Sequence, residues 1–321
     1  MIFGSKTRFG LIGPAKTTII LTVVFFLCAA FAGTAVAQKK FSRSYPTGSQ
    51  VKLSLLNRTG TVEVTGWDRP DVKISASIES GMLRFDANSS RVSLSVEESD
   101  DSGRRRRHDV GEARYDVSVP RGVRLILEAV SGDINAAGSQ GQIEATSVSG
   151  DVDVTNGITE VSAESVSGSV HAAQINGNLR AETVSGDVRA ESISGNLEAT
   201  SVSGNVRLVG AQSKDVRTET VSGDITYSGS IDAGGKYSFE SHSGTLRLNI
   251  PRNAGAQFSV ETFSGDVTTD FPVTIPARSR RSEGRMEFTL RDGRARVTAQ
   301  TFSGRIVIDS GSDSTTRRDD E

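Results

Sequence analysis

The sequence predicts an all-β protein whose main part is a single-stranded β-solenoid (a β-helix or β-roll) with about 18–21 residues per coil. Three observations predict this fold. Glycines recur on a nine-residue grid in the middle of the chain, apolar residues alternate with polar ones in short runs, and aromatic residues make up only 6% of the composition, against 33 glycines. Thin strands joined by tight corners suit this composition, whereas a bulky globular core does not.

The first 37 residues indicate a signal peptide. A basic region with Lys6 and Arg8 precedes an almost entirely apolar run, and Ala35-Val36-Ala37 offers a small-x-small cleavage site. The alternative is an uncleaved membrane anchor, because the apolar run approaches spanning length. Membrane contact would then be confined to this segment. The only cysteine, Cys28, lies inside it, so we expect no disulfide in the exported chain.

Residues 38–128 are predicted to form a β-rich N-terminal part, in which runs such as Val51, Leu53 and Leu55 alternate with polar residues. Between 97 and 114 an acidic stretch and the arginine run 104–107 interrupt this pattern. We interpret the interruption as a solvated loop at a hairpin tip. A basic contact for an anionic polymer is the weaker alternative, because acids adjoin the arginines and no aromatic residue accompanies them. With a net charge of −2, the chain is not expected to bind nucleic acid.

A nine-residue unit repeats across 129–310, the predicted solenoid array. It begins with glycine, followed by Asp or Asn and then an aliphatic residue; an alanine comes two positions later and a second aliphatic residue three positions after that. Thr/Ser-Val-Ser-Gly returns with every second unit, so two units form one 18-residue coil. Its glycines are predicted to be structural corners that supply backbone angles which a residue with a Cβ resists. These corners are Gly132, Gly150, Gly168, Gly186, Gly204 and Gly223.

This register predicts three columns of core side chains, stacked coil upon coil. One inner column contains Ile134, Val152, Val170, Val188, Val206 and Ile225, the opposite one Ile143, Val161, Leu179, Leu197 and Val216, and a corner column Val130, Val148, Val166, Val184, Val202 and Val221. Thr183, Ser185 and Arg189 are expected to stay on the surface. Arg180 and Glu198 are expected to stack as opposite charges on the outside.

The coils after Gly223 are longer and more aromatic. His242, Phe263 and Phe302 take the corner position that valine holds earlier, as expected if longer coils enclose more volume. Residues 277–285 are predicted to form an exposed loop, and 311–321 a disordered polar tail.

An aspartate ladder is the best candidate for a metal site. Asp133, Asp151, Asp187 and Asp224 recur along one edge, and stacked carboxylates can hold Ca²⁺. The unit nevertheless lacks the Gly-Gly-x-Gly-x-Asp pattern of calcium-binding nonapeptide repeats. We therefore interpret these aspartates as residues that stabilise turns, with calcium binding as the weaker alternative, and we expect no cofactor.

The sequence offers little support for catalysis. His108, His171 and His242 lie far apart, and no Gly-x-Ser-x-Gly, His-Glu-x-x-His or P-loop motif is present. Asp153, His171 and Arg189 share one outward column, which resembles the carboxylate and arginine clusters of some β-helix enzymes that cleave acidic polysaccharides. Surface charge pairing is the simpler explanation, so we expect no catalytic residue.

Several motifs together resemble one known family. They are the repeated Val-Ser-Gly-Asp-Val and the segments 57–68, 115–120, 248–251 and 262–266. The chain is similar, over about residues 45–310, to the bacterial putative-adhesin domain family, a domain of unknown function. This resemblance implies an exported β-solenoid of the cell envelope and brings no catalytic residues with it.

The leading hypothesis is therefore a non-catalytic exported protein of the periplasm, the cell envelope or the extracellular space, with an adhesin-like binding or structural role. Its partner would be an envelope or surface ligand, either a protein or a glycan. Two alternatives remain. One is a polysaccharide-binding protein or polysaccharide lyase that uses an outward solenoid face, and the other is a calcium-stabilised repeat scaffold.

Overall fold

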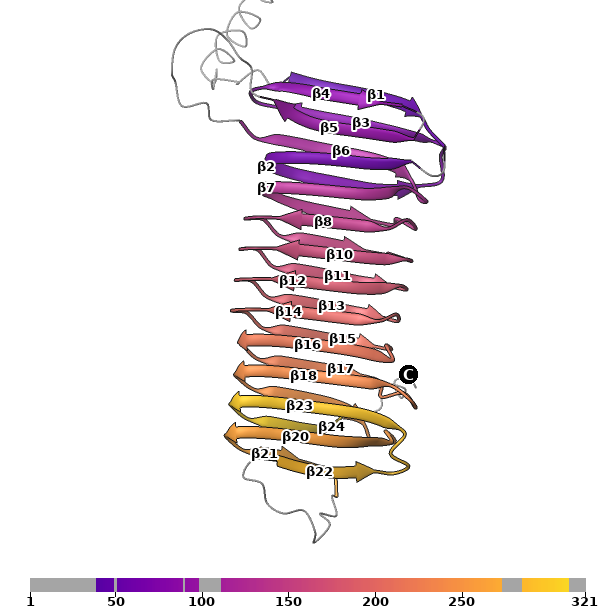
Figure 1. The fold of residues 1–321 in the computed structure, drawn as a ribbon. Coiled ribbons are helices and arrows are strands. Elements are labelled where there is room, and N and C mark those ends of the chain that lie inside the picture. Colours follow the sequence, from indigo (N-terminus) through magenta and orange to yellow (C-terminus); the bar gives the residue numbers. More distant parts are fainter. Residues whose placement is uncertain (1–38, 49–50, 89, 98–110, 273–284, 312–321) are drawn as a thin grey trace, which may run out of the picture. The chain divides into compact units, whose positions relative to one another are not determined.

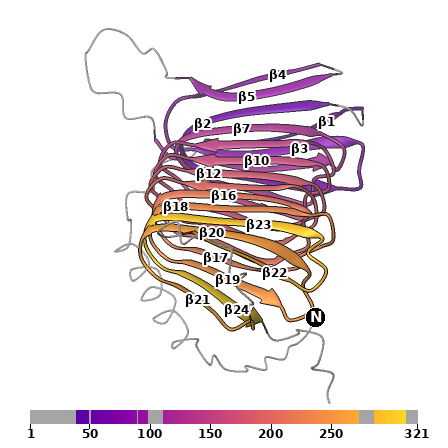
Figure 2. The ribbon, with the colours of Figure 1, turned by 60° about the horizontal axis from the view of Figure 1, so that its bottom comes forward.

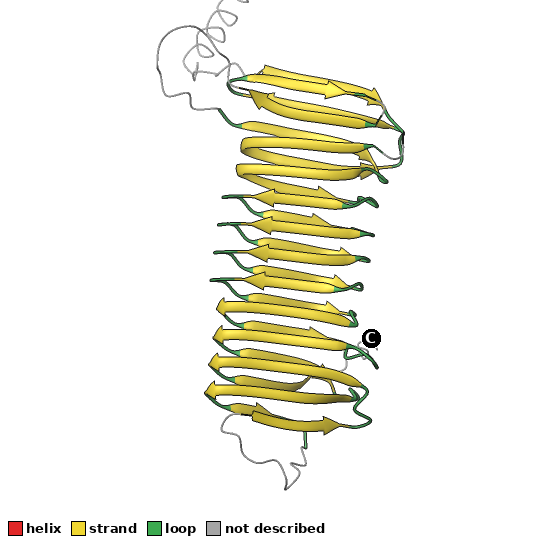
Figure 3. Ribbon diagram, viewed as in Figure 1, coloured by secondary structure: helices red, strands yellow, loops and turns green. Residues whose placement is uncertain are grey.

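In the computed structural model, short strands pair in parallel with the strand one coil further along the chain (Figures 1 and 3). The structure describes residues 39–48, 51–88, 90–97, 111–272 and 285–311, and every regular element in these ranges is a strand. The predicted all-β solenoid is thus confirmed. The signal peptide predicted at 1–37, the arginine run with His108, and all but one residue each of the loop 277–285 and the tail 311–321 lie outside the described ranges. Within those ranges, no helix is long and apolar enough to cross a membrane.

The strands that begin each coil form the first face of the solenoid. Val161 pairs with Leu179 and Leu179 with Leu197, so the 18-residue period is confirmed. In order along the stack, this face contains β8 (Ile143–Ser147), β10 (Glu160–Ser165), β12 (Asn178–Thr183), β14 (Leu197–Ser201), β16 (Asp215–Ser222) and β18 (Lys236–Ser243).

The second face follows each corner and runs back beneath the first (Figure 2). Val170 pairs with Val188, again one coil apart, whereas Ile225 pairs with Leu246 because the later coils lengthen to 21 residues. This face contains β9 (Val152–Thr155), β11 (Val170–Ile175), β13 (Val188–Ile193), β15 (Val206–Ala211), β17 (Ile225–Gly229) and β19 (Leu246–Pro251).

At the N-terminal end, two long strands run through both faces and join the β-rich part to the array. They are β2 (Lys52–Trp67) and β7 (Arg124–Ala137), which pair in parallel, and β7 spans the position at which the array was predicted to begin. Beyond β2 lie β5 (Arg91–Glu97) and β6 (Ala113–Pro120). Antiparallel strands then close this end: β3 (Asp71–Ile78) on β6, β1 (Lys39–Pro46) on β3, and β4 (Met82–Ala87) on β5.

At the C-terminal end, the last coil of the chain inserts between two earlier ones. The strands β23 (Ala295–Ser303) and β24 (Ile306–Gly311) pair with β18 and β19 on one side. On the other side they pair with β20 (Ala256–Ser264) and β21 (Val267–Thr269). The antiparallel strand β22 (Arg285–Leu290) on β20 then ends the stack.

The core consists of aliphatic columns between the two faces. The two predicted inner columns are confirmed, since all their members from Ile134 to Ile225 and from Ile143 to Val216 are buried. In the longer coils the extra volume is filled by aromatic rings from both faces. Tyr227 packs against Phe239 with ring centroids 5.1 Å apart, and burial raises the pKa of the Tyr227 phenol.

The prediction that the corner valines belong to the core is wrong. Val184 is 44% exposed, whereas Thr183, predicted on the surface, is only 4% exposed. The strand alternation that buries Leu179 and Ala181 continues without a break to Thr183, so Val184 is directed outward. His242, Phe263 and Phe302 are likewise exposed, so they do not fill the volume of the longer coils.

The six predicted corner glycines lie where the first face turns into the second, but for a different reason from the predicted one. All six are described, and none has a left-handed φ. A Cβ on Gly186 would instead lie 2.1 Å from the carbonyl oxygen of Gly168, one coil away. The left-handed column is at the opposite turn, where it includes non-glycine residues such as Gln174 and Ser192, with φ of 57° and 56°. The corner glycines are therefore needed for close approach between coils.

Candidate functional site

An exposed row of apolar and aromatic side chains runs along one corner of the solenoid. We call it the corner ridge; it consists of Val130, Val148, Val166, Val184, Val202, Val221, His242, Phe302 and Phe263, in order along the stack. Its six valines are between 40% and 48% exposed. Contiguous apolar surface of this kind on a protein marks an interaction site more often than scattered single residues do.

The residue before each ridge position explains why the ridge is held outside. Thr183 Oγ1 donates to the carbonyl oxygen of Gly168 at 2.8 Å and accepts from the N–H of Gly186 at 3.2 Å. Ser147, Ser165 and Ser201 are buried at the same position and each donates to the glycine of the preceding coil. The hydroxyl satisfies two backbone groups at the turn, so the inward place is taken and the ridge residue faces solvent.

The C-terminal end of the ridge is aromatic. His242 and Phe302 stack with ring centroids 4.9 Å apart, and Phe302 and Phe263 with centroids 4.8 Å apart, all three rings nearly parallel. The spacing follows from the distance between neighbouring strands. Phe263 is the last ring of the stack and is 78% exposed, which is unusual for phenylalanine in a soluble protein.

Acidic side chains flank the ridge on both faces. On the first face, two positions before the ridge, a glutamate row contains Glu164, Glu182, Glu219, Glu240 and Glu261, with Thr200 and Gln300 in the same row. Part of its charge is compensated: Arg180 contacts Glu182 at 2.6 Å, and a hydrogen bond to Glu219 raises the pKa of Arg217. On the second face, three positions after the ridge, stands the aspartate ladder.

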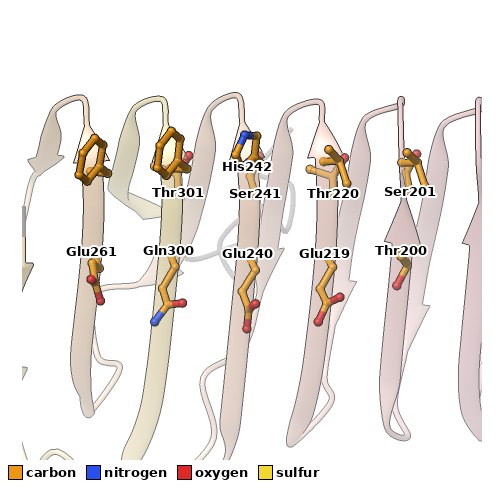
Figure 4. A pocket seen from close by; sticks show the side chains of 14 residues that line it. Thr200, Ser201, Glu219, Thr220, Glu240, Ser241, His242, Glu261, Gln300 and Thr301 are labelled. Carbon is orange, nitrogen blue, oxygen red and sulfur yellow. The ribbon is translucent and has the colours of Figure 1, made fainter.

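A groove of about 530 Å³ lies between the aromatic end of the ridge and the glutamate row. It crosses β14, β16, β18, β23 and β20, and its floor is formed by buried hydroxyl side chains such as Thr220 and Ser241. Figure 4 shows Glu219, Glu240, Gln300 and Glu261 in one line on successive strands, with His242 above Glu240. The arrangement combines an apolar wall with an acidic wall, so it suits an elongated ligand that carries both apolar and positively charged groups.

The predicted aspartate ladder forms, and its hydrogen bonds join neighbouring coils. Asp133 Oδ1 accepts from the N–H of Asp151 at 3.0 Å, and Asp187 Oδ1 accepts from the N–H of Asn205 at 2.8 Å. Asp151 and Asp224 accept in the same way from Ser169 and Thr245. These bonds run between coils, so each carboxylate ties its coil to the next one. In the described residues, no three His, Cys, Asp or Glu side chains gather as a metal-binding group.

The outward column of Asp153, His171 and Arg189 forms on neighbouring strands, and its side chains make surface charge pairs. His171 Nδ1 lies 3.2 Å from Asp153 Oδ2, while Arg189 pairs with Glu191 on its own strand. His171 Nε2 is buried and has no hydrogen-bond partner among the described residues. His242 lies in the corner ridge, so it belongs to a different surface. The predicted Arg180–Glu198 pair forms at 3.0 Å.

Sequence reasoning missed the corner ridge, although a signal for it is present. The strict alternation of buried and exposed residues along 179–184 places Val184 outside, but valine in a repeat suggests a core position. The aromatic replacements at His242, Phe263 and Phe302 were a second signal, since a surface position tolerates a change of side-chain volume that a packed core resists.

Three solved structures match the chain at low sequence identity and low TM-score. A putative cell adhesion protein from Clostridium sporogenes is 11% identical, covers 85% of this chain and 99% of its own, and has a TM-score of 0.24. A putative adhesin from Bacteroides fragilis is 13% identical, the match covers 84% of this chain and 97% of the adhesin, and the TM-score is 0.37. A putative lipid binding protein from Parabacteroides distasonis is 13% identical, the match covers 85% of this chain and 97% of that protein, and the TM-score is 0.39. These values do not indicate what the present chain binds.

No curated protein shows significant sequence similarity to the chain. A domain family of unknown function does match, once over residues 50–208 and again, in an overlapping register, over 141–309. The overlap follows from the repeat, because units of the array are alike enough to be matched one or more coils apart. Together the two matches span the stack from β2 to β24, and this chain belongs to the Toastrack DUF4097 family.

Proposed function

We propose that this protein is a non-catalytic, exported protein of the cell envelope or cell surface that binds a partner along the corner ridge. One observation carries the proposal: the ridge keeps an apolar side chain exposed on successive coils and ends in stacked aromatic rings. A side chain that served packing alone would be buried, and the adjacent hydroxyl already satisfies the turn. Binding surfaces commonly expose aromatic anchors beside polar groups.

The binding proposal is tested with the double variant Phe263→Ser, Phe302→Ser. Both side chains are exposed, so the fold should tolerate the change, and circular dichroism verifies this. The full chain and the variant are immobilised and used to capture material from intact envelopes of the producing cell. We expect captured protein or glycan to be lost with the double variant and kept with Val209→Ser, which alters an exposed apolar side chain on the second face. Equal capture by all three would contradict the proposal.

The export and the non-catalytic role are tested separately. Cell fractionation followed by mass spectrometry of the N-terminus should find the chain outside the cytoplasm and beginning at Gln38. A chain that retains residues 1–37 in the envelope fraction would indicate the membrane anchor instead. Turnover of uronic-acid polymers that is lost in Asp153→Asn would contradict the non-catalytic role, and the pair of Asp153 with His171 is the place where such an activity would be sought.

A further inference from the structure

We propose that the partner in the groove beside the corner ridge is a basic segment of polypeptide in which apolar side chains alternate with lysine or arginine. This inference rests on the proposed function, and it adds the chemical class of the partner. Four properties of the groove support it: its walls, its length, the charge on both sides of the ridge, and the open face of the terminal ring.

The two walls of the groove differ in chemistry. One wall is the aromatic end of the ridge, and the other is the glutamate row, where Glu240 and Glu261 have no ion-pair partner among the described residues. Glu240 accepts a hydrogen bond from Ser238 Oγ at 3.1 Å and is attracted to Arg217, which is itself hydrogen-bonded to Glu219. Arg285, the register neighbour of Glu261, pairs with Glu287. An extended segment directs successive side chains to opposite sides, so alternating apolar and basic residues would meet the two walls.

The length of the groove matches a short extended segment. The groove crosses five strands, hence four strand spacings of about 4.8 Å, or about 19 Å in all. An extended chain advances about 3.3 Å per residue, so about six residues fill this length. Three apolar side chains and three basic ones would then face the ridge and the glutamate row.

The charges on both sides of the ridge favour a positively charged partner. Asp224 and Asp266 lie on the second face, opposite the glutamate row, with Arg305 between them in the inserted coil. A second copy that docked ridge to ridge would bring carboxylates against carboxylates. An anionic membrane surface would be repelled for the same reason. A basic segment is attracted from both faces.

The terminal ring offers a further contact for a cation. Phe263 covers one face of Phe302, but it is itself 78% exposed and ends the stack. A guanidinium or ammonium group placed over an exposed aromatic face is attracted by the ring quadrupole. Glu261, two residues earlier on the same strand, adds a carboxylate to the opposite wall of the groove.

The test uses the full chain and three labelled six-residue peptides, with binding followed by fluorescence anisotropy. The first peptide alternates lysine with phenylalanine or leucine, the second replaces lysine by glutamate, and the third replaces the apolar residues by serine. We expect the first to bind at least about tenfold more tightly than the other two, and to weaken when salt is raised from about 0.05 to 0.5 M. The double variant Glu240→Gln, Glu261→Gln should lower its affinity about fivefold. Glu63→Gln, on the second face near the N-terminal end, should leave it unchanged.

The outcomes separate this inference from the proposed function. One outcome is that the full chain binds the acidic peptide as well as the basic one, and that the Phe263→Ser, Phe302→Ser variant binds neither. The ridge then binds without charge selection, and only the inference is wrong. If neither peptide binding nor envelope capture depends on the two phenylalanines, the proposed function is wrong as well. Dimerisation of the full chain in sedimentation that the same variant abolishes would identify a second copy as the occupant and overturn the inference.

Discussion

Replacing Gly186 by alanine should separate two neighbouring coils. The added Cβ would lie 2.1 Å from Gly168 O and 2.5 Å from Gly168 C, and both atoms belong to backbone that cannot rotate away. Ordinary contact begins near 3.4 Å, so the coils must move apart locally by about 1.3 Å. Because Gly204 stands over Gly186 in the same way, the displacement has no free direction along the stack.

The magnitude follows from the hydrogen bonds that this movement breaks. The bond from Thr183 Oγ1 to Gly168 O, now 2.8 Å, and the bond from Ser185 N to Val166 O, now 2.9 Å, would both exceed hydrogen-bonding distance. A buried donor or acceptor left without a partner costs about 1–3 kcal/mol each. Alanine returns about 0.4–1 kcal/mol by restricting the unfolded chain. We therefore expect Gly186→Ala to lower the free energy of unfolding by about 1–5 kcal/mol.

Two other glycines isolate the cause. A Cβ on Gly48 meets nothing within 4 Å, so Gly48→Ala should change stability by less than about 0.5 kcal/mol. Gly210 has a φ of 65° but only ordinary contacts, so Gly210→Ala should cost about 1–2 kcal/mol through backbone strain alone. Urea unfolding followed by far-UV circular dichroism measures all three. If Gly186→Ala unfolds at the same urea concentration as Gly48→Ala, close approach between coils does not explain the repeated glycine.

Four further predictions concern the corner, the ladder and two buried tyrosines of the core. Thr183→Val should lower the free energy of unfolding by about 1–3 kcal/mol, because two backbone groups lose their hydrogen-bond partner. Ser185→Ala, at an exposed position, should change it by less than about 0.5 kcal/mol, and the urea midpoints of the two variants measure the difference. Asp187→Ala should lower the free energy of unfolding by about 1 kcal/mol, whereas Asp187→Asn, which keeps the acceptor oxygen, should change it little. A chelator should leave the thermal midpoint of the protein unchanged, and a midpoint that falls on chelation would favour the calcium scaffold. Burial raises the pKa of Tyr115 and Tyr227 above the unfolded value of about 10. The stability that these neutral phenols contribute is therefore complete below about pH 10 and is lost as the pH rises further. Absorbance at 295 nm and urea midpoints at pH 9 and 11 measure this loss. Tyr227→Phe should cost about 1 kcal/mol, since its hydroxyl donates a hydrogen bond at 2.6 Å, whereas Tyr115→Phe should be neutral, since its buried hydroxyl has no partner among the described residues; the reverse order of the two urea midpoints would contradict this assignment.

The repeat made the core predictable, because burial in a strand follows a period of two. Once Val188 was placed inside, its equivalents one coil away had to be inside as well, and the structure confirms both inner columns. The same rule, applied to the end of β12, places Val184 outside. The prediction failed there because Val184 was assigned to the core as a repeated apolar residue, although the alternation that buries Leu179 and Ala181 continues to Thr183.

The order of the C-terminal coils was not predictable from local sequence. The coils that contain Phe263 and Phe302 both carry Thr-Phe-Ser-Gly, so either could pair with β18. Parallel pairing depends only on the alternation of buried and exposed residues and on the corner sequence, and these are the same in both coils. Placing β23 between β18 and β20 leaves β20 free to pair in antiparallel register with β22, which covers the outer edge. The choice is therefore made by how the end of the stack is closed, a property that no single repeat contains.

The four residues Thr-Val-Ser-Gly at each corner divide into two that the fold needs and two that it leaves free. The hydroxyl of Thr183 and the missing Cβ of Gly186 are required by backbone groups of the adjoining coils, whereas Val184 and Ser185 face solvent. A change at the ridge position therefore costs the stack little, and the chain carries histidine or phenylalanine there in three coils. Glu240 and Glu261 line the groove beside these aromatic positions, so the changed ridge residues and an acidic wall lie together at one groove. A scaffold that keeps its inner columns constant and varies its corner can acquire a binding site without repacking its core.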